Sequence, residues 1–564
     1  MLFFDDFGEK MLDEQRHSQH EESDDEMPRH MKDEKYITRG VVEQILAALA
    51  PSERREIPDT ARIDVHAAVS RFAVLYERIR NAVDYKDDHL LRKAAIVRIL
   101  KRQLLLESNP IEIATNLVRE LIGACYLPNN ELPETLIGEV AERVRKYQAV
   151  ERARVGSTAH LAWLRRIISA EIDEVVVETS SEQAWASLLY ERLADRVHVR
   201  EAANLPDGQG KQIDDQEFRL QLYMACMRLV MKSDDDMIGY NLLRAYLPEW
   251  QRSAEWIDAP KQIAERLLDV ERRIRQAIEN PLAPKLQRAI KPWAVSFVIL
   301  RDAARAYPAG AAALLADPVA LANAVTERAE RQMKTAKRKL RRGAIRAIIY
   351  IFLTKMLIAF ALELPLEKVF YGDVHVTALL FNLLFPPFLM FLVALFIRVP
   401  GKENASRIQE HARTFLTAAG VHPFDIRLRP HRGWFGTLWF GLAYATLYVL
   451  IFGLITLALL RIHFTWVSIL VFLFFLCTVS FFAFRLRQNA REQVIVNGRE
   501  RLRSVLIDIV SLPILRVGSW LSRGISRINV FLFFFDILLE APFKLFLSVL
   551  EEWFSYLREK REEL

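Results

Sequence analysis

The feature that most restricts how this chain can fold is the series of long apolar stretches that begins near residue 344. Four stretches are each close to the ~20 residues that a helix needs to cross the hydrocarbon core of a bilayer. A backbone inside lipid must satisfy its own hydrogen bonds, so these stretches are expected to be helices. They predict a transmembrane region over 331–485 with four spans, at about 344–362, 376–397, 437–460 and 466–484.

The residues before this region have a very different composition. Residues 1–40 hold 12 Asp and Glu against 6 Lys and Arg and few apolar residues, which predicts a disordered acidic tail over 1–36. From 37 to 330 apolar residues recur at spacings of three and four, the pattern of amphipathic helices. Clear examples are 62–83, 90–106 and 110–127. The 37–330 segment is therefore predicted to be a cytoplasmic, all-helical domain.

Several helix ends are also marked in the sequence. Pro110 follows Ser108 and Asn109, a pattern typical of a helix start. The acids at 234–236 favour another start, because carboxylates stabilise the first turn of a helix. One segment, 174–180, resembles a strand, but an isolated strand does not make a sheet. The predicted fold class is all-α, a large cytoplasmic helical domain followed by a four-helix membrane region and C-terminal amphipathic helices.

The charges between the apolar stretches predict their orientation. Eight Lys and Arg and no acid occupy 331–346, whereas the next connection, 363–375, carries three acids and one Lys. The 398–436 connection is basic again, as are the residues after 485. Basic connections stay on the cytoplasmic side. The first residues lack the apolar core of a cleavable signal. We therefore expect a multi-pass protein of the cell membrane whose N-terminal domain is cytoplasmic.

The basic run before the first span also suggests a lipid contact. Basic residues beside an anionic leaflet are each worth ~1 kcal/mol of membrane attraction. A topology signal alone would have the same composition, and the two interpretations are compatible. The candidate residues for contact with anionic headgroups are Lys334, Lys337, Arg338, Lys339, Arg341 and Arg342.

Polar and helix-breaking residues inside the predicted spans are candidate functional positions. Lys355 lies near the middle of the first span, where a charge costs roughly 2.5–3.5 kcal/mol. Asn382, Pro386 and Pro387 lie in the second, and two prolines predict a kink or a broken helix. Broken helices beside a buried charge are used by transporters. The preferred interpretation is a packing kink and one structurally paired lysine.

The C-terminal residues 486–564 are predicted to form amphipathic helices on the cytoplasmic side of the membrane. Arg516, Arg523 and Arg527 share a face beside Trp520, which is typical of a helix lying among headgroups. The following stretch, 527–557, reads at first as a fifth span. Its polar residues instead form one narrow stripe on a helical wheel, and the candidate functional residues of this stripe are Asp536, Glu540 and Lys544.

Three interpretations of residues 528–550 remain open. The helix could lie in the membrane interface with its polar stripe toward water. It could enter the membrane with the stripe toward other helices, where Asp536 or Glu540 could meet Lys355. It could instead pack in an oligomer with the stripe inside.

Catalytic, cofactor and metal motifs are not evident in the sequence. Residues 206–212 hold Gly208, Gly210 and Lys211, but Gln212 follows where a phosphate-binding loop needs Ser or Thr. Charged helices such as 269–279 alternate signs and lack interleaved aromatics, so nucleic acid is not an expected partner. No cofactor, metal or small-molecule substrate is predicted. The three scattered cysteines suggest no disulfide framework.

These observations predict a non-catalytic integral membrane protein. We expect it to anchor or organise protein partners at the cytoplasmic face of the cell membrane, as a scaffold, with self-association as a second form of contact. The alternative is a subunit of a transporter or channel that uses Lys355 and the kinked second span.

Overall fold

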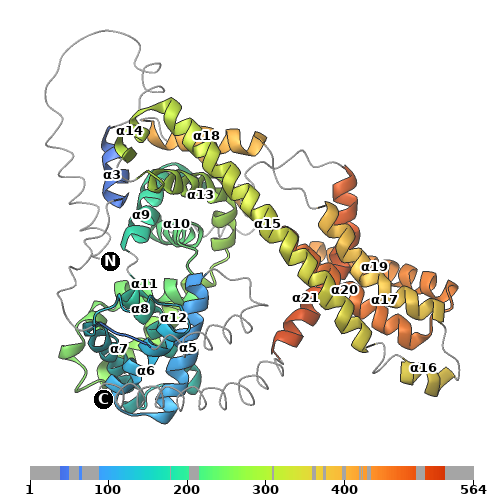
Figure 1. Ribbon diagram of the computed structural model, residues 1–564, viewed down its shortest axis with the longest axis horizontal. Helices are drawn as coiled ribbons and strands as arrows, with labels where there is room; N and C mark the ends of the chain where they lie inside the picture. Colours follow the sequence, from blue (N-terminus) through green and yellow to red (C-terminus); the bar gives the residue numbers. More distant parts are fainter. Residues whose placement is uncertain are drawn as a thin grey trace, which may run out of the picture.

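The computed structural model is almost entirely helical, in agreement with the predicted all-α class (Figure 1). The acidic tail 1–36, the loop 206–212 and the polar stripe of Asp536, Glu540 and Lys544 lie outside the residues that it describes. The described residues are 39–49, 62–65, 88–177, 180–201, 215–307, 310–358, 364–371, 376–396, 402–417, 421, 423–428, 434–490 and 502–527.

The helices of the soluble part pack around two separate hydrophobic cores. The first core lies between six α-helices and two short 3₁₀ turns, and Figure 1 shows it as the lower group. Its elements are α5 (Asp88–Leu106), α6 (Pro110–Gly123), α7 (Thr135–Arg152), α8 (Thr158–Val176), α11 (Asp235–Tyr246), η1 (Pro248–Gln251), η2 (Ser253–Glu255) and α12 (Lys261–Ile278).

The second core is built from segments that are far apart in the sequence. Its N-terminal helices are joined by the first half of α15 and by a helix and a strand from beyond residue 400. The elements are α3 (Arg39–Leu49), α9 (Ser180–Ala194), β1 (Val197–Glu201), α10 (Asp215–Val230), α13 (Ala283–Arg305), α14 (Ala311–Ala316), α15 (Pro318–Ile358), α18 (Lys402–Leu416) and β2 (Phe424–Leu428). The predicted domain boundary at residue 330 therefore falls inside α15.

Both helix starts that the sequence marks are present. Asn109 caps α6 by accepting a hydrogen bond from the Ile111 amide, and Pro110 occupies the first helical position. Asp234 caps α11 by accepting from the Met237 amide. These local signals could be read from the sequence because the capping residue and its partner are only two or three positions apart.

The strand that the sequence suggests at 174–180 is wrong. Those residues begin as the last turn of α8, where Ile172 and Val176 pack into the first core. The observed pairing is instead β1 with β2, parallel, with Val197 opposite Phe424. Tertiary burial overrides the β-propensity of the 174–177 valines, and β1 is paired with a strand more than 200 residues away.

Among the described residues, five longer helices form a bundle apart from the two cores (Figure 1). Besides α15, its members are α17 (Val376–Phe396), α19 (Trp434–Arg461), α20 (Trp466–Ala490) and α21 (Leu502–Arg527), and the short α16 (Leu364–Tyr371) precedes α17. The second half of α15 packs on α17 and α20, the second and fourth predicted spans, and α21 packs on α20.

Two of these helices are long and apolar enough to cross a membrane, not four. They are Leu438–Arg461 and Trp466–Arg485. In the described part of α17 the apolar segment is shorter, Leu380–Leu392. α15 ends at Ile358, only 14 positions after its apolar part begins at residue 344. The structure thus supports membrane association, and four crossings remain a prediction.

Direct contacts show that α17 and α20 run in the same direction. The Asn382 side chain donates to the Ser468 carbonyl, and one turn further along both helices Phe385 packs on Phe472. The pairs advance together in sequence, which happens only when two packed helices are parallel.

The last described helix, α21, packs closely on α20. A Cβ added to Gly518 would overlap the Cys477 carbonyl and lie 2.7 Å from the Phe481 Cβ. Only glycine therefore permits this crossing at the observed separation. Ile514, one turn earlier on α21, packs against the apolar cluster that includes Phe472 and Leu476.

Candidate functional site

One helix connects the soluble cores to the bundle without a break. α15 has 41 residues, which corresponds to about 61 Å at 1.5 Å per residue. Its Val325 and Met333 side chains are buried in the second core, and its Ala344 and Ile351 side chains are buried in the bundle. The two parts are therefore joined by a continuous hydrogen-bonded backbone rather than by a loop (Figure 1).

A second connection returns from the bundle to the same core. α18 and β2 lie between α17 and α19 in the sequence, yet Ile408 and Phe415 of α18 are buried in the second core. Thr326 of α15 donates to the Gln409 side chain, 3.2 Å away. α18 and β2, which belong to the 398–436 connection, thus lie on the same side of the bundle as the soluble cores.

An imidazole lies in the contact between α18 and α13. The ring of His411 stacks on Trp293, with centroids 4.1 Å apart, and its Nδ1 is 3.3 Å from the Ser296 hydroxyl. Burial lowers the pKa of His411 below its ordinary value, an effect opposed by the Pro292 carbonyl and by Glu410. This contact was not predicted, because no short-range signal links residues about 115 positions apart.

Lys355, the candidate charge of the first span, is completely buried in the bundle. Its ammonium lies 4.7 Å from the centroid of the Phe475 ring on α20, a cation–π distance. The predicted approach of Asp536 or Glu540 to Lys355 involves residues outside the described ranges. The interpretation of Lys355 as a structurally paired lysine stays a prediction.

The other candidates of the second span have different roles. Asn382 is fully buried and donates to the Ser468 carbonyl across a distance of 3.4 Å. The sequence predicts a kink or a broken helix at Pro386 and Pro387; α17 runs through both as one helix, so it is not broken, and the preferred packing kink stays a prediction. Packing of α17 against α15 and α20 holds the helix together despite the lost backbone donors.

The basic residues of α15 lie on the stretch between the two packed regions. All six candidates, Lys334, Lys337, Arg338, Lys339, Arg341 and Arg342, are exposed. Lys334 is 4.0 Å from Glu330. For the five from Lys337 to Arg342, no carboxylate of the described residues lies within ion-pair distance.

The first core contains buried ion pairs that the sequence analysis did not identify. Lys146 of α7 and Glu171 of α8 are both 1% exposed, and their charged atoms are 2.7 Å apart. The second Glu171 oxygen accepts from the Trp250 indole at 2.9 Å, and Lys146 also lies over that ring. The signal in the sequence was Glu171, an acid that stands among apolar residues in 167–176 and interrupts the buried face of α8.

A histidine and a carboxylate form another buried pair in this core. His160 Nδ1 lies 2.5 Å from Glu271, which also contacts Arg275. The ring is 2% exposed and stacks on Trp163, so it is shielded from solvent and from any substrate. Within the described ranges, no three His, Cys, Asp or Glu side chains are grouped to hold a metal ion.

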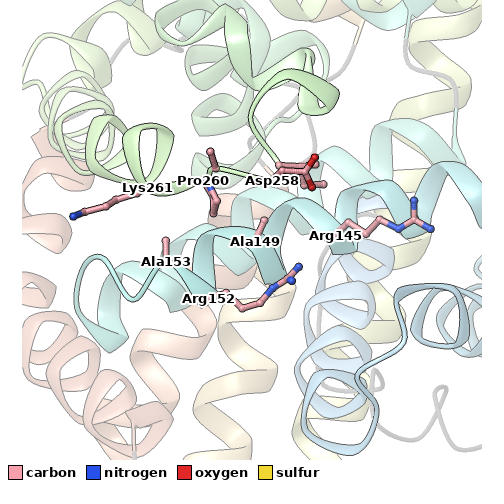
Figure 2. A pocket seen from close by; sticks show the side chains of 9 residues that line it. Arg145, Ala149, Arg152, Ala153, Asp258, Pro260 and Lys261 are labelled. Atoms are coloured by element: carbon pink, nitrogen blue, oxygen red, sulfur yellow. The ribbon is translucent and has the colours of Figure 1, made fainter.

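A surface cleft of about 710 Å³ opens beside the first core. Figure 2 shows that α7 supplies Arg145 and Arg152, while Asp258 and Lys261 come from the segment that leads into α12. The Arg145 guanidinium and the Lys261 ammonium extend toward opposite ends of the view. The cations do not converge on one point, so the cleft is a basic surface hollow rather than a formed anion site.

Comparison of the chain with protein-family models, with curated proteins and with solved structures found no match.

Proposed function

We propose that this chain is a multi-pass membrane protein that holds a large helical domain at a fixed position against the cytoplasmic face of the cell membrane, where the domain binds protein partners. The proposal concerns anchoring and presentation, and it assigns no reaction to the chain.

The observation that supports it best is the double connection between the bundle and the second core. α15 contributes buried residues to both, and α18 enters the core again from the opposite end of α17. Two independent attachments resist both bending and rotation, whereas a single loop would allow the domain to move freely. Such a connection suits a protein that presents a surface at a defined distance from the bilayer.

The arrangement of the bundle is consistent with four crossings. The second and fourth predicted spans, α17 and α20, are parallel, as alternating crossings require. The basic connection that contains α18 lies beside the soluble cores, in agreement with the side assigned by its charge. α19 is largely exposed along its apolar length, with Leu442, Val449 and Leu454 each at least 60% exposed. Lipid is the expected surrounding for such a surface.

The test is recovery of partners with the full-length protein in mild detergent, followed by mass spectrometry of bound proteins. A charge-reversal variant, R145E/R152E/K261E, changes the surface hollow of Figure 2 without touching either core. We expect specific proteins to co-purify with the wild type. Recovery of nothing beyond what an unrelated membrane protein retains would contradict the proposal.

A transporter or channel subunit is the second candidate, favoured by the buried Lys355 and Asn382 at the centre of the bundle. The variant Lys355→Met separates the two functions. It should abolish solute flux in reconstituted vesicles if the bundle conducts, and it should leave partner recovery unchanged if the bundle is an anchor.

A further inference from the structure

The exposed middle of α15 carries its positive charge on one side only. With about 100° per residue, all the basic side chains from Lys334 to Arg346 fall within an arc of about 200°. The opposite arc holds Met333, Ala336, Leu340, Gly343 and Ala344, which are buried or half-buried. We name the exposed side the basic arc and define it as Lys334, Lys337, Arg338, Lys339, Arg341, Arg342 and Arg346.

The basic arc is located where headgroups would be if the bundle spans a bilayer. Met333 marks the last contact of α15 with the second core, and the next buried residues are Gly343 and Ala344, with half-buried Leu340 already packed on the bundle. Lys337 to Arg342 lie between them, a rise of about 8 Å at 1.5 Å per residue. This length matches the headgroup layer, roughly 5–8 Å on each side of the hydrocarbon.

Beyond Lys334, the charges of the basic arc are not neutralised by the described part of the protein. Arg331 and Lys334 approach Glu327 and Glu330, and no ion pair follows further along the helix within the described residues. Four of the remaining groups are guanidinium ions, whose planar donors bind two oxygens of one phosphate. An anion that supplies phosphate oxygens at this depth would complete the arrangement.

We propose that the basic arc is a binding site for the headgroups of acidic phospholipids in the cytoplasmic leaflet. The inference rests on the membrane placement given under the proposed function. Lipid would then hold the basic arc while protein contacts hold the opposite side of α15. The two together would fix the helix against rotation about its own axis.

The test uses the full-length protein reconstituted in phosphatidylcholine vesicles that contain nitroxide-labelled phosphatidylglycerol or nitroxide-labelled phosphatidylcholine. The fraction of immobilised label gives the relative association of each lipid. We expect the wild type to prefer phosphatidylglycerol several-fold and K337Q/R338Q/R341Q/R342Q to lose most of that preference, since each basic residue is worth about fivefold. About 1 M NaCl should weaken the wild-type preference as well, because the Debye length over which charges interact shortens to about 3 Å.

A matched control removes four exposed charges elsewhere. R219Q/R252Q/K261Q/R272Q changes the net charge by the same amount, at exposed positions on the helices around the soluble cores. This variant should keep the wild-type preference for phosphatidylglycerol. Equal association of both lipids with the wild type, or an unchanged preference in the basic-arc variant, would overturn the proposal. Displacement of labelled lipid by glycerol phosphate at constant ionic strength would show a site for soluble phosphates instead. Immobilisation of neither lipid would contradict the membrane placement itself.

Discussion

The Lys146 and Glu171 pair is the residue-level contact on which the first core depends most. Both side chains are 1% exposed, and Glu171 also accepts from the Trp250 indole. Substitution Lys146→Met removes the closer of the two cations at this buried carboxylate and leaves Arg143, whose Nε is 3.6 Å from it. Breaking a buried ion pair in this way costs up to about 3–5 kcal/mol. We expect K146M to lower the free energy of unfolding by up to that amount, measured by urea titration with intrinsic tryptophan fluorescence as the signal.

The matched control is an exposed ion pair. Arg272 and Asp269 are both about 70% exposed and 3.3 Å apart on α12. Water solvates both charges, so R272M should change the free energy of unfolding by less than about 1 kcal/mol. Equal effects of the two substitutions would mean that the buried pair has no special role in stability.

Because His411 is half-buried between α13 and α18, we expect the stability of the contact between these two helices to depend on pH. Its pKa is lower in the folded protein than in the unfolded chain, because burial against Trp293 disfavours the charged ring. The unfolded state therefore binds the proton more readily, and stability falls as the pH drops below about 6.5. The nearby charges are Glu410, which opposes this shift, and Arg407, which adds to it.

The measurement is the rate of limited proteolysis of α18 at pH 7.5 and at pH 5.5. We expect faster cleavage at pH 5.5 in the wild type. In His411→Phe, which keeps an aromatic ring against Trp293 but cannot be protonated, the acceleration should disappear. The same acceleration in both proteins would assign the pH effect to other groups.

At the scale of elements, the closest helix crossing in the bundle depends on one glycine. Any Cβ at Gly518 would overlap the backbone of α20 at Cys477, which cannot move aside as a side chain can. Gly518→Ala should therefore separate α21 from α20, with a cost of about 1–3 kcal/mol for overpacking. Thermal unfolding in detergent should show a lower midpoint, and α21 should become cleavable by protease.

Gly453 on α19 is the control for this substitution. No atom lies within 4 Å of the position that its Cβ would occupy. Because alanine favours the helix over glycine by up to about 1 kcal/mol, Gly453→Ala should be neutral or slightly stabilising. Similar losses at both positions would show that the α20–α21 crossing is not the cause.

The elements also show which parts of the fold could be read from the sequence. The starts of α6 and α11 were predictable because each cap and its partner are adjacent. The bounds predicted for the second apolar helix, 376–397, match those of α17, while its crossing of a membrane stays a prediction. The helix continues through Pro386 and Pro387, where packing by α15 and α20 holds it together. The pairing of β1 with β2 and the role of Gly518 depend on contacts between distant segments, for which one sequence carries no signal.

At the scale of the whole molecule, the division into a soluble and an apolar part followed from composition, whereas the way the parts are joined did not. Composition places a boundary near residue 330, yet α15 passes through it as one helix. The second core is completed by α18, which the sequence presents only as a basic connection between two spans. Of the candidate residues, Lys355 and Asn382 are buried in the bundle and the basic run is exposed, while the roles assigned to them stay predictions.

This arrangement leads to a prediction for the topology of the complete chain. Ser406 is exposed on α18 beside the soluble cores, whereas Ile462 is 45% exposed in the turn between α19 and α20, at the other end of the bundle. If the bundle crosses the membrane, these two positions face opposite compartments. Single cysteines at the two positions, in a background with Cys125, Cys226 and Cys477 replaced, can be probed with a membrane-impermeant maleimide.

We expect Ile462→Cys to react in intact cells and Ser406→Cys to react only after the membrane is permeabilised. The reason is that α18 is buried in the same core as the N-terminal helices and cannot be separated from them by a bilayer. A cysteine at Leu564 should behave like Ser406→Cys if the chain after α20 does not cross again. Reaction of Ser406→Cys and Ile462→Cys under identical conditions would mean that α19 and α20 do not span the membrane, and the apolar surface of α19 would then require a protein partner.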